Sequence, residues 1–148
     1  ATVGMIVNRP NSRNVVPGET VFSVELRDTG IAGLDRMEQG LRAAAARIAQ
    51  EQSLAIDVRQ TVFFPPCHFD PACVAAVRAG AAGLGYRHMD IVSGAGHDAV
   101  YIAGVAPTAM IFVPCEGGIS HNEIENATPE DLAAGCNVLL QAVLAKAG

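Results

Sequence analysis

Two consecutive prolines, Pro65 and Pro66, interrupt the sequence between two stretches of different character. Proline donates no backbone hydrogen bond and has a fixed φ, so two in a row end a β-strand. Composition changes at the same place, which predicts a domain junction at about residues 65 to 70. The two parts, 1–66 and 67–148, are each small for an independent hydrophobic core.

The first part combines strand and helix patterns. Apolar residues at every second position predict strands at 1–7, 20–28 and 54–64. Between the last two, apolar residues three and four positions apart predict an amphipathic helix at 33–52. The first part is therefore expected to be β-β-α-β.

The second part has the pattern of helices packed on a sheet. An alanine-rich helix is predicted at 71–83, and short apolar runs at 89–93 and 109–115 predict buried strands. A last helix is expected to begin after Thr128 as N-cap, with a proline at its first position. Its buried stripe is predicted to consist of Leu132, Cys136, Leu139, Leu140 and Val143. Aromatic residues are few and Trp is absent, so the interior must be built from Ala, Val, Leu and Ile, as is common in α/β proteins, and the chain is expected to belong to that class.

Charge and composition exclude several classes of function. The net charge of -5, with ten basic and fifteen acidic residues in no long runs, offers no basic surface for nucleic acid. No apolar run approaches the roughly 20 residues that span a bilayer, so we expect no membrane partner and a cytoplasmic location. The four cysteines form no CxxC and are interpreted as reduced apolar residues. A start at Ala1 without methionine suggests that upstream sequence was removed.

His121 is a candidate metal ligand. It follows the predicted strand at 109–115, in a glycine-containing loop with Ser120, Asn122 and Glu125. A neutral imidazole there is a good ligand for zinc-like ions, and the carboxylates could orient it. The alternative is an ordinary hydrogen-bonded surface histidine, because the metal would need ligands from elsewhere.

A second glycine-containing turn, at 93–99, carries the adjacent pair His97 and Asp98. The pair could serve a metal, a proton transfer or an oxyanion. Equally, it could mark a helix start, with Asp98 near the cap and His97 bonded to backbone. Ser93 does not lie in the Gly-x-Ser-x-Gly elbow of serine hydrolases, so a catalytic serine is not expected.

Asn14 and Arg27 are candidate substrate-binding residues. One loop and one strand separate them, so both could present polar groups to one side of a sheet, where a guanidinium can clamp a carboxylate. Taken alone, Arg27 is more simply a solvated charge paired with Glu25 or Asp28.

Five sequence segments occur in an order that resembles a known family. They are PNSRNVVPG at 10–18, ELR at 25–27, SGAGHDA at 93–99, MIFVPC at 110–115 and GISHNE at 118–123. Together they resemble the hydantoinase/carbamoylase branch of the metallopeptidase-like amidohydrolases, which includes N-carbamoyl-L-amino-acid hydrolases, β-ureidopropionase and allantoate amidohydrolase. The resemblance covers nearly the whole chain. Its departures are conservative: Glu25 where Asp is usual, and Val16 where Ile is common.

The resemblance implies an architecture and a site. Such enzymes have a catalytic α/β domain with two zinc or manganese ions and an inserted strand-and-helix domain that forms the dimer and covers the active site. Residues 1–66 resemble the later part of the inserted domain, and 67–148 the C-terminal part of the catalytic domain. His121 corresponds to the last metal ligand. The residues that correspond to substrate-binding positions are Asn14, Arg27, Gly96 and His97.

The resemblance also implies what this chain lacks. The family's other metal ligands, including a His-x-Asp pair and a bridging carboxylate, and its glutamate base lie upstream of anything present here. One imidazole cannot hold two ions that each need about four ligands. We therefore expect no catalytic residue in this chain, and no activity from it alone.

Three readings of function follow from the resemblance. The first is a fragment of a homodimeric, metal-dependent amidohydrolase that cleaves the carbamoyl C–N bond of N-carbamoyl-L-amino acids. The second is an enzyme acting on allantoate or another ureido acid. The third is a non-catalytic dimerisation or binding module that lacks the metal site.

Overall fold

The computed structural model describes residues 1–147 and has a mixed α and β fold. It divides into two compact units, Ala1–Pro66 and Cys67–Gly148, which are described in turn. Within the described range, no helix is both long enough and apolar enough to cross a membrane.

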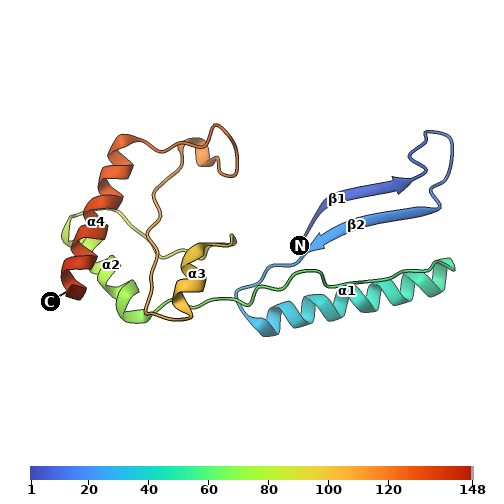
Figure 1. Cartoon of the computed structure of the whole chain (residues 1–148), viewed down its shortest axis with the longest axis horizontal. Helices are drawn as coiled ribbons and strands as arrows, with labels where there is room; N and C mark the ends of the chain where they lie inside the picture. The colour runs from blue at the N-terminus through green and yellow to red at the C-terminus, as the bar shows by residue number, and fades with distance from the viewer. Residues whose placement is uncertain (148) are drawn as a thin grey trace. The chain divides into compact units, whose positions relative to one another are not determined.

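The first unit contains a β-hairpin and a long helix (Figure 1). Strands β1 (Thr2–Arg9) and β2 (Glu19–Glu25) pair antiparallel, with an irregularity in register between Val3 and Met5. Helix α1 (Ile31–Gln52) begins after Gly30 and ends at Ser53, which has a left-handed φ of 52°. The two N-terminal strands and the amphipathic helix predicted from the sequence are confirmed.

The strand predicted at 54–64 is wrong. The described residues form one two-stranded sheet, and this segment does not belong to it. It runs beside α1, where Arg42 Nη1 donates to the carbonyl of Val58 at 2.9 Å. A strand exists only where a neighbour takes up its backbone hydrogen bonds, and side-chain alternation alone does not supply that neighbour.

The second unit is built around two packed helices. Its elements are α2 (Pro71–Gly83), α3 (Asp98–Ala103), the 3₁₀ helix η1 (Glu116–Gly118) and α4 (Pro129–Ala147). Helices α2 and α4 pack together. Among the described residues, the buried apolar side chains all lie on these two helices: Ala81 at 6%, Val138 at 6% and Ala142 at 8% exposure.

Side-chain caps fix where both helices begin. Asp70 accepts a hydrogen bond of 2.7 Å from the Cys73 N–H at the start of α2, and this bond lowers the pKa of Asp70. The Asp131 N–H donates to Thr128 Oγ1 at 3.1 Å, which confirms Thr128 as the cap of α4. Such caps satisfy amides that the first helical turn leaves without partners.

The strands predicted at 89–93 and 109–115 are also wrong, because neither segment has a pairing strand among residues 1–147. Met89 and Val92 are largely exposed. The second segment nevertheless keeps a strand-like alternation: Ile111 and Val113 are half-buried, and Phe112 between them is exposed. The alternation is present in the structure, but no strand of residues 1–147 pairs with this segment.

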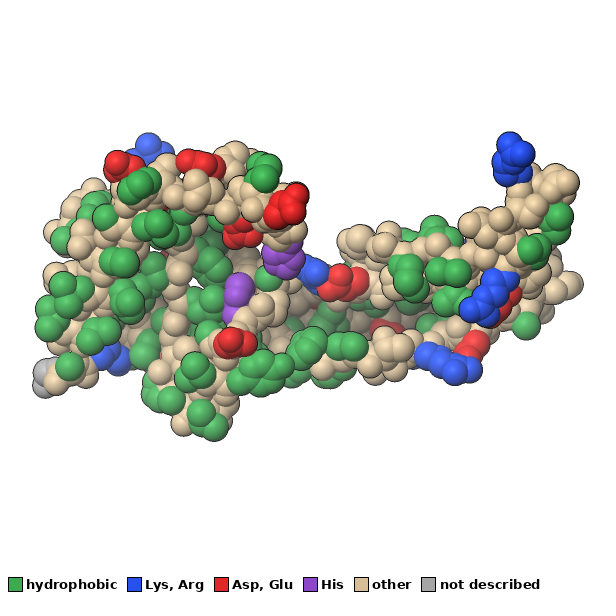
Figure 2. Space-filling model, turned by 45° about the horizontal axis from the view of Figure 1, so that its top comes forward, with side chains coloured by type: hydrophobic (Ala, Val, Ile, Leu, Met, Phe, Trp, Pro, Cys, Tyr) green, Lys and Arg blue, Asp and Glu red, His purple; other side chains and the backbone are tan. Residues whose placement is uncertain are grey.

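The predicted buried stripe of α4 is wrong as well. Leu132, Leu139, Leu140 and Val143 are each more than half exposed, and apolar side chains lie openly over this unit in Figure 2. All of these except Leu140 line a cavity of about 500 Å³ between α2, α4 and the 109–113 segment. Helix α4 instead buries Val138 and Ala142, because these residues face α2, the helix that packs against it.

The close approach of α2 and α4 depends on Gly80. A Cβ at this position would lie 3.1 Å from Gln141 Cβ and 3.4 Å from the Val138 carbonyl oxygen. We expect Gly80→Leu to force the helices apart and to lower the free energy of unfolding by about 2 kcal/mol. Urea denaturation followed by circular dichroism measures this.

The matched control is Gly83→Leu, at the last residue of α2, where a Cβ meets nothing within 4 Å. The midpoint of its urea transition should equal or exceed that of the wild type, because leucine is a better helix former than glycine. Equal destabilisation by the two substitutions would contradict the role given to Gly80.

Candidate functional site

The segment 109–115 connects the two polar loops of the second unit. Ile111 and Val113 face the cavity beside α2 and α4. Phe112 instead meets His97, with ring centroids 5.4 Å apart and an interplanar angle of 65°. At the end of the segment, Cys115 Sγ lies 3.8 Å from Glu125 Oε1 of the next loop. One extended segment therefore contacts both loops that the sequence singled out.

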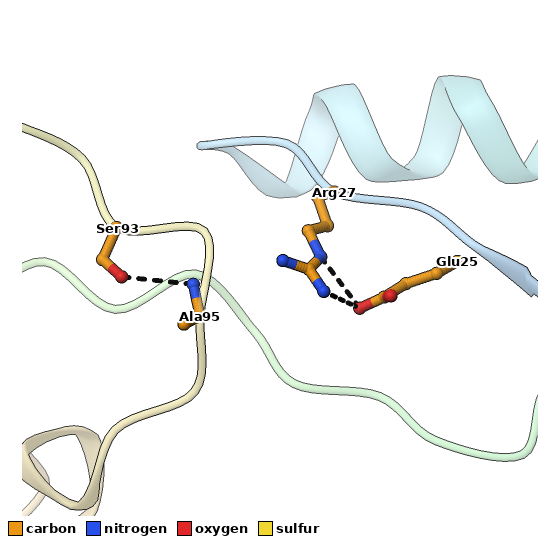
Figure 3. Close-up of polar contacts among 4 residues, drawn as sticks. All are labelled: Glu25, Arg27, Ser93 and Ala95. Carbon is orange, nitrogen blue, oxygen red and sulfur yellow. Dashed lines mark hydrogen bonds and ion pairs between the residues drawn. The ribbon is translucent and has the colours of Figure 1, made fainter. Parts of the chain in front are cut away.

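The first loop, residues 93–97, is held by hydrogen bonds to Ser93. The Ala95 N–H donates to Ser93 Oγ at 3.1 Å (Figure 3). Ser93 Oγ also lies 2.6 Å from His97 Nε2. A Cβ at Gly96 would meet nothing within 4 Å, so the backbone there is open to a ligand.

The same turn is a helix start, one of the two possibilities left open by the sequence. His97 is the N-cap of α3 with φ of -137°, and Asp98 is its first residue. The His97 ring is bonded to the Ser93 side chain and not to backbone as that alternative supposed. The turn therefore leads into α3 and also holds an imidazole in a defined orientation.

The second loop, residues 116–126, presents His121. Its ends are joined by the Glu116 N–H donating to the Asn126 carbonyl at 2.8 Å and by Asn126 Nδ2 donating to Glu116 Oε2 at 3.1 Å. The His121 N–H donates to Glu125 Oε2 at 2.8 Å. His121 itself has a φ of 56°, in the left-handed region that few non-glycine residues adopt.

The loop does not complete a metal centre. Within residues 1–147, no group of three or more His, Cys, Asp or Glu side chains is arranged to hold a metal ion. The Glu125 carboxylate of this loop accepts a hydrogen bond from the His121 N–H. The residues present therefore do not fit a closed one-metal or two-metal site. In Figure 2, imidazoles lie exposed near acidic side chains of this unit.

Asn14 and Arg27 lie at opposite ends of the hairpin in the first unit. Asn14 is in the loop between the strands, where its Oδ1 accepts from Ser12 Oγ at 2.8 Å. Arg27 follows β2, whose seven residues span roughly 20 Å at about 3.3 Å per residue. One copy of this unit therefore does not bring the two side chains to a common point.

Arg27 pairs with Glu25, as one reading of the sequence expected. Its Nε and Nη2 lie 2.8 and 2.7 Å from Glu25 Oε1 (Figure 3). Both side chains are more than half exposed, at 59% and 58%. An exposed ion pair of this kind contributes about 0–1 kcal/mol to stability, so a ligand carboxylate can compete with Glu25 for the guanidinium.

Sequence reasoning missed two partners of His97. Ser93 was considered only as a nucleophile and Phe112 only as part of a strand. The spacing of Ser93 and His97, four residues apart across two glycines, was the available signal for a turn that brings them together. The contact with Phe112 has no local signal, because Phe112 lies 15 positions after His97 in the sequence.

Comparison with known proteins gives a consistent result along the whole chain. The model of peptidase family M20/M25/M40 matches residues 1–145. An N-carbamoyl-L-amino-acid amidohydrolase of Rhizobium meliloti is 48% identical over 142 residues, covering 96% of this chain and 34% of that protein. An allantoate amidohydrolase of Escherichia coli strain K12 is 39% identical over 140 residues, covering 93% of this chain and 34% of that protein.

Solved structures agree. The crystal structure of an amidase of the hydantoinase/carbamoylase family from Burkholderia multivorans superposes with a TM-score of 0.93 at 56% identity. It matches 97% of this chain and 35% of its own length. The chain thus spans about a third of the proteins that it resembles.

Proposed function

This chain belongs to peptidase family M20/M25/M40, and from that membership we propose that it is the C-terminal part of an N-carbamoyl-L-amino-acid amidohydrolase. The observation that carries the proposal is the 48% identity with the Rhizobium meliloti enzyme across 96% of the chain. The intact protein would use water to cleave the carbamoyl C–N bond, releasing ammonia, carbon dioxide and the amino acid. It would act as a cytoplasmic homodimer.

The two units take different parts in the proposed enzyme. Residues 1–66 are assigned to the later part of an inserted domain that makes the dimer and covers the site, and 67–148 to the C-terminal part of the catalytic domain. The division between Pro66 and Cys67 supports this assignment. A dimer would also offer a way for Asn14 of one copy and Arg27 of another to reach one site.

Substrate binding is assigned to Asn14, Arg27, Gly96 and His97. Arg27 would exchange its exposed contact with Glu25 for the substrate carboxylate, which matches the planar fork of a guanidinium. The open backbone at Gly96 and the held imidazole of His97 would orient the ureido group. These residues bind and position the substrate; the groups that move protons are assigned to parts of the enzyme outside this chain.

His121 is the one residue of this chain to which we assign metal binding. The M20 family is generally metal-dependent, and we propose two zinc or manganese ions in the intact enzyme. The left-handed conformation of His121 and the hydrogen bond from its backbone N–H to the Glu125 carboxylate support a preformed position for the imidazole. The described residues lack the further ligands, which would come from the remaining two thirds of the enzyme.

Two other functions remain to be tested against this one. The 39% identity with the Escherichia coli enzyme favours allantoate as an alternative substrate. A non-catalytic binding or dimerisation module is the other function, and it accounts for the lack of a three-ligand group among residues 1–147 as well as a part of a larger metal site does. Ammonia release from an N-carbamoyl-L-amino acid and from allantoate distinguishes the three functions.

We expect no ammonia from the purified 148-residue chain with an N-carbamoyl-L-amino acid, whether zinc, manganese or no metal is added. A chimera, in which this chain replaces the matched third of the Rhizobium meliloti enzyme, should release ammonia within about tenfold of that enzyme, because the upstream ligands are then supplied. Ammonia release is measured with both N-carbamoyl-L-amino acids and allantoate.

Each outcome has a distinct meaning. Preference for allantoate would replace the proposed substrate. A folded, metal-loaded dimer that hydrolyses neither compound would support the non-catalytic module. Metal-dependent release by the 148-residue chain alone would show that it builds its own site and would overturn the ligand assignment.

A further inference from the structure

Ser93 has a role that the proposed function does not assign. Its hydroxyl is the centre of two interactions in the 93–97 turn: the Ala95 N–H donates to it at 3.1 Å, and His97 Nε2 lies 2.6 Å away. A serine hydroxyl has one hydrogen to donate and two lone pairs that accept. The Ala95 amide uses one lone pair and leaves the hydrogen available to His97.

The contact with Ala95 favours the serine as donor to His97. Because the Ser93 oxygen already accepts a hydrogen bond from the Ala95 N–H, its single hydrogen can be directed at His97 Nε2, 2.6 Å away. With the Ser93 hydrogen directed at Nε2, that ring nitrogen is the acceptor, and the proton of the neutral imidazole is on Nδ1.

The orientation of the ring is fixed from a second side. Phe112 meets the His97 ring in an edge-on arrangement with centroids 5.4 Å apart, and the backbone of His97 is the N-cap of α3. Ring rotation that exchanged the two nitrogens would break the bond to Ser93. Tautomer and orientation are therefore set together.

We propose that Ser93 is a positioning residue that holds His97 as an Nδ1–H hydrogen-bond donor. The consequence of this tautomer for catalysis rests on the proposed function. An N–H donor at Nδ1 would bind an acceptor atom of the ureido acid, namely its carbonyl or carboxylate oxygen. The tautomer itself does not depend on that function and can be measured without any substrate.

The first test is ¹⁵N NMR of the His97 ring in the full 148-residue chain at pH 8.5, above the usual titration range of histidine. We expect wild type and Ser93→Thr, which keeps the hydroxyl, to show the Nδ1–H tautomer. Ser93→Ala should shift the ring toward the Nε2–H form that free histidine favours. Thr108→Ala, which removes a hydroxyl bonded to the Ala106 carbonyl, is the matched control and should leave His97 unchanged.

A wild-type ring in the Nε2–H form, a free-histidine pattern in wild type, or the same tautomer in Ser93→Ala as in wild type would each overturn the proposal. The second test uses the chimera. Ser93→Ala should raise KM about tenfold for an N-carbamoyl-L-amino acid, with rescue by Ser93→Thr. A chimera that hydrolyses no substrate would contradict the proposed function, while the NMR result would still decide the role of Ser93.

Discussion

Replacing His121 by alanine in the chimera is expected to reduce ammonia release more than about 100-fold and to lower the bound metal. Loss of groups that merely orient a metal ligand typically costs about 10–100-fold, and loss of the ligand itself should cost more. The left-handed backbone of His121 and the hydrogen bond from its N–H to Glu125 support the proposed role as a ligand. Metal content by mass spectrometry and ammonia release are measured on the same preparation.

The matched control for His121 is His88→Ala. His88 is exposed, and its Nδ1 lies 2.9 Å from the carbonyl of Tyr86, so no ligand role is assigned to it. This variant should keep its metal and its activity. If His121→Ala kept wild-type metal content and turnover, His121 would be an ordinary surface histidine.

Glu125 provides an intermediate case. Glu125→Ala removes the acceptor of the His121 amide but leaves the imidazole in place. Activity should fall about 10–100-fold, less than in His121→Ala, because the ligand remains but its loop is no longer held. A loss as large as that of His121→Ala would assign Glu125 a direct role.

Replacing Arg27 by alanine is expected to raise KM about 10- to 100-fold with little change in metal content. Hydrogen bonds to charged groups contribute about 1.5–3 kcal/mol, and each 1.4 kcal/mol is a factor of ten in binding. Arg27→Lys should recover only part of the loss, because an ammonium lacks the two-pronged geometry of a guanidinium. Initial rates across substrate concentrations separate KM from kcat.

Arg47→Ala is the control for Arg27. Arg47 also makes an exposed ion pair, with Glu51 on α1, but has no proposed contact with substrate. Its replacement should leave KM unchanged. Equal losses of substrate and metal binding in Arg27→Ala would contradict a role in holding the carboxylate.

Much of the candidate site could be predicted because its features are local. The polar turn at 93–97 and the loop around His121 were recognised from glycines and polar residues that lie close together in sequence. The pairing of Arg27 with Glu25, two residues away, was foreseen as one alternative and is observed. The contacts of His97 with Phe112 and of Cys115 with Glu125 were not predicted, because they depend on how distant segments pack.

The sequence by itself determined the three long helices, α1, α2 and α4. Helix α2 spans the predicted residues 71–83, and Thr128 caps α4 as expected. A helix hydrogen-bonds to its own residues four positions away, and its cap uses a side chain within three, so all the required information is local. The same reasoning explains the β1–β2 hairpin, whose two strands are joined by one short loop.

Tertiary structure decided which alternating segments become strands and which helix faces are buried. Residues 54–64 and 109–115 alternate as strands do, yet no strand in residues 1–147 pairs with them. Helix α4 buries Val138 and Ala142 against α2 and leaves Leu139 more than half exposed. A strand ladder and a buried face each need a distant partner, and the pattern within one segment carries no information about whether that partner is present.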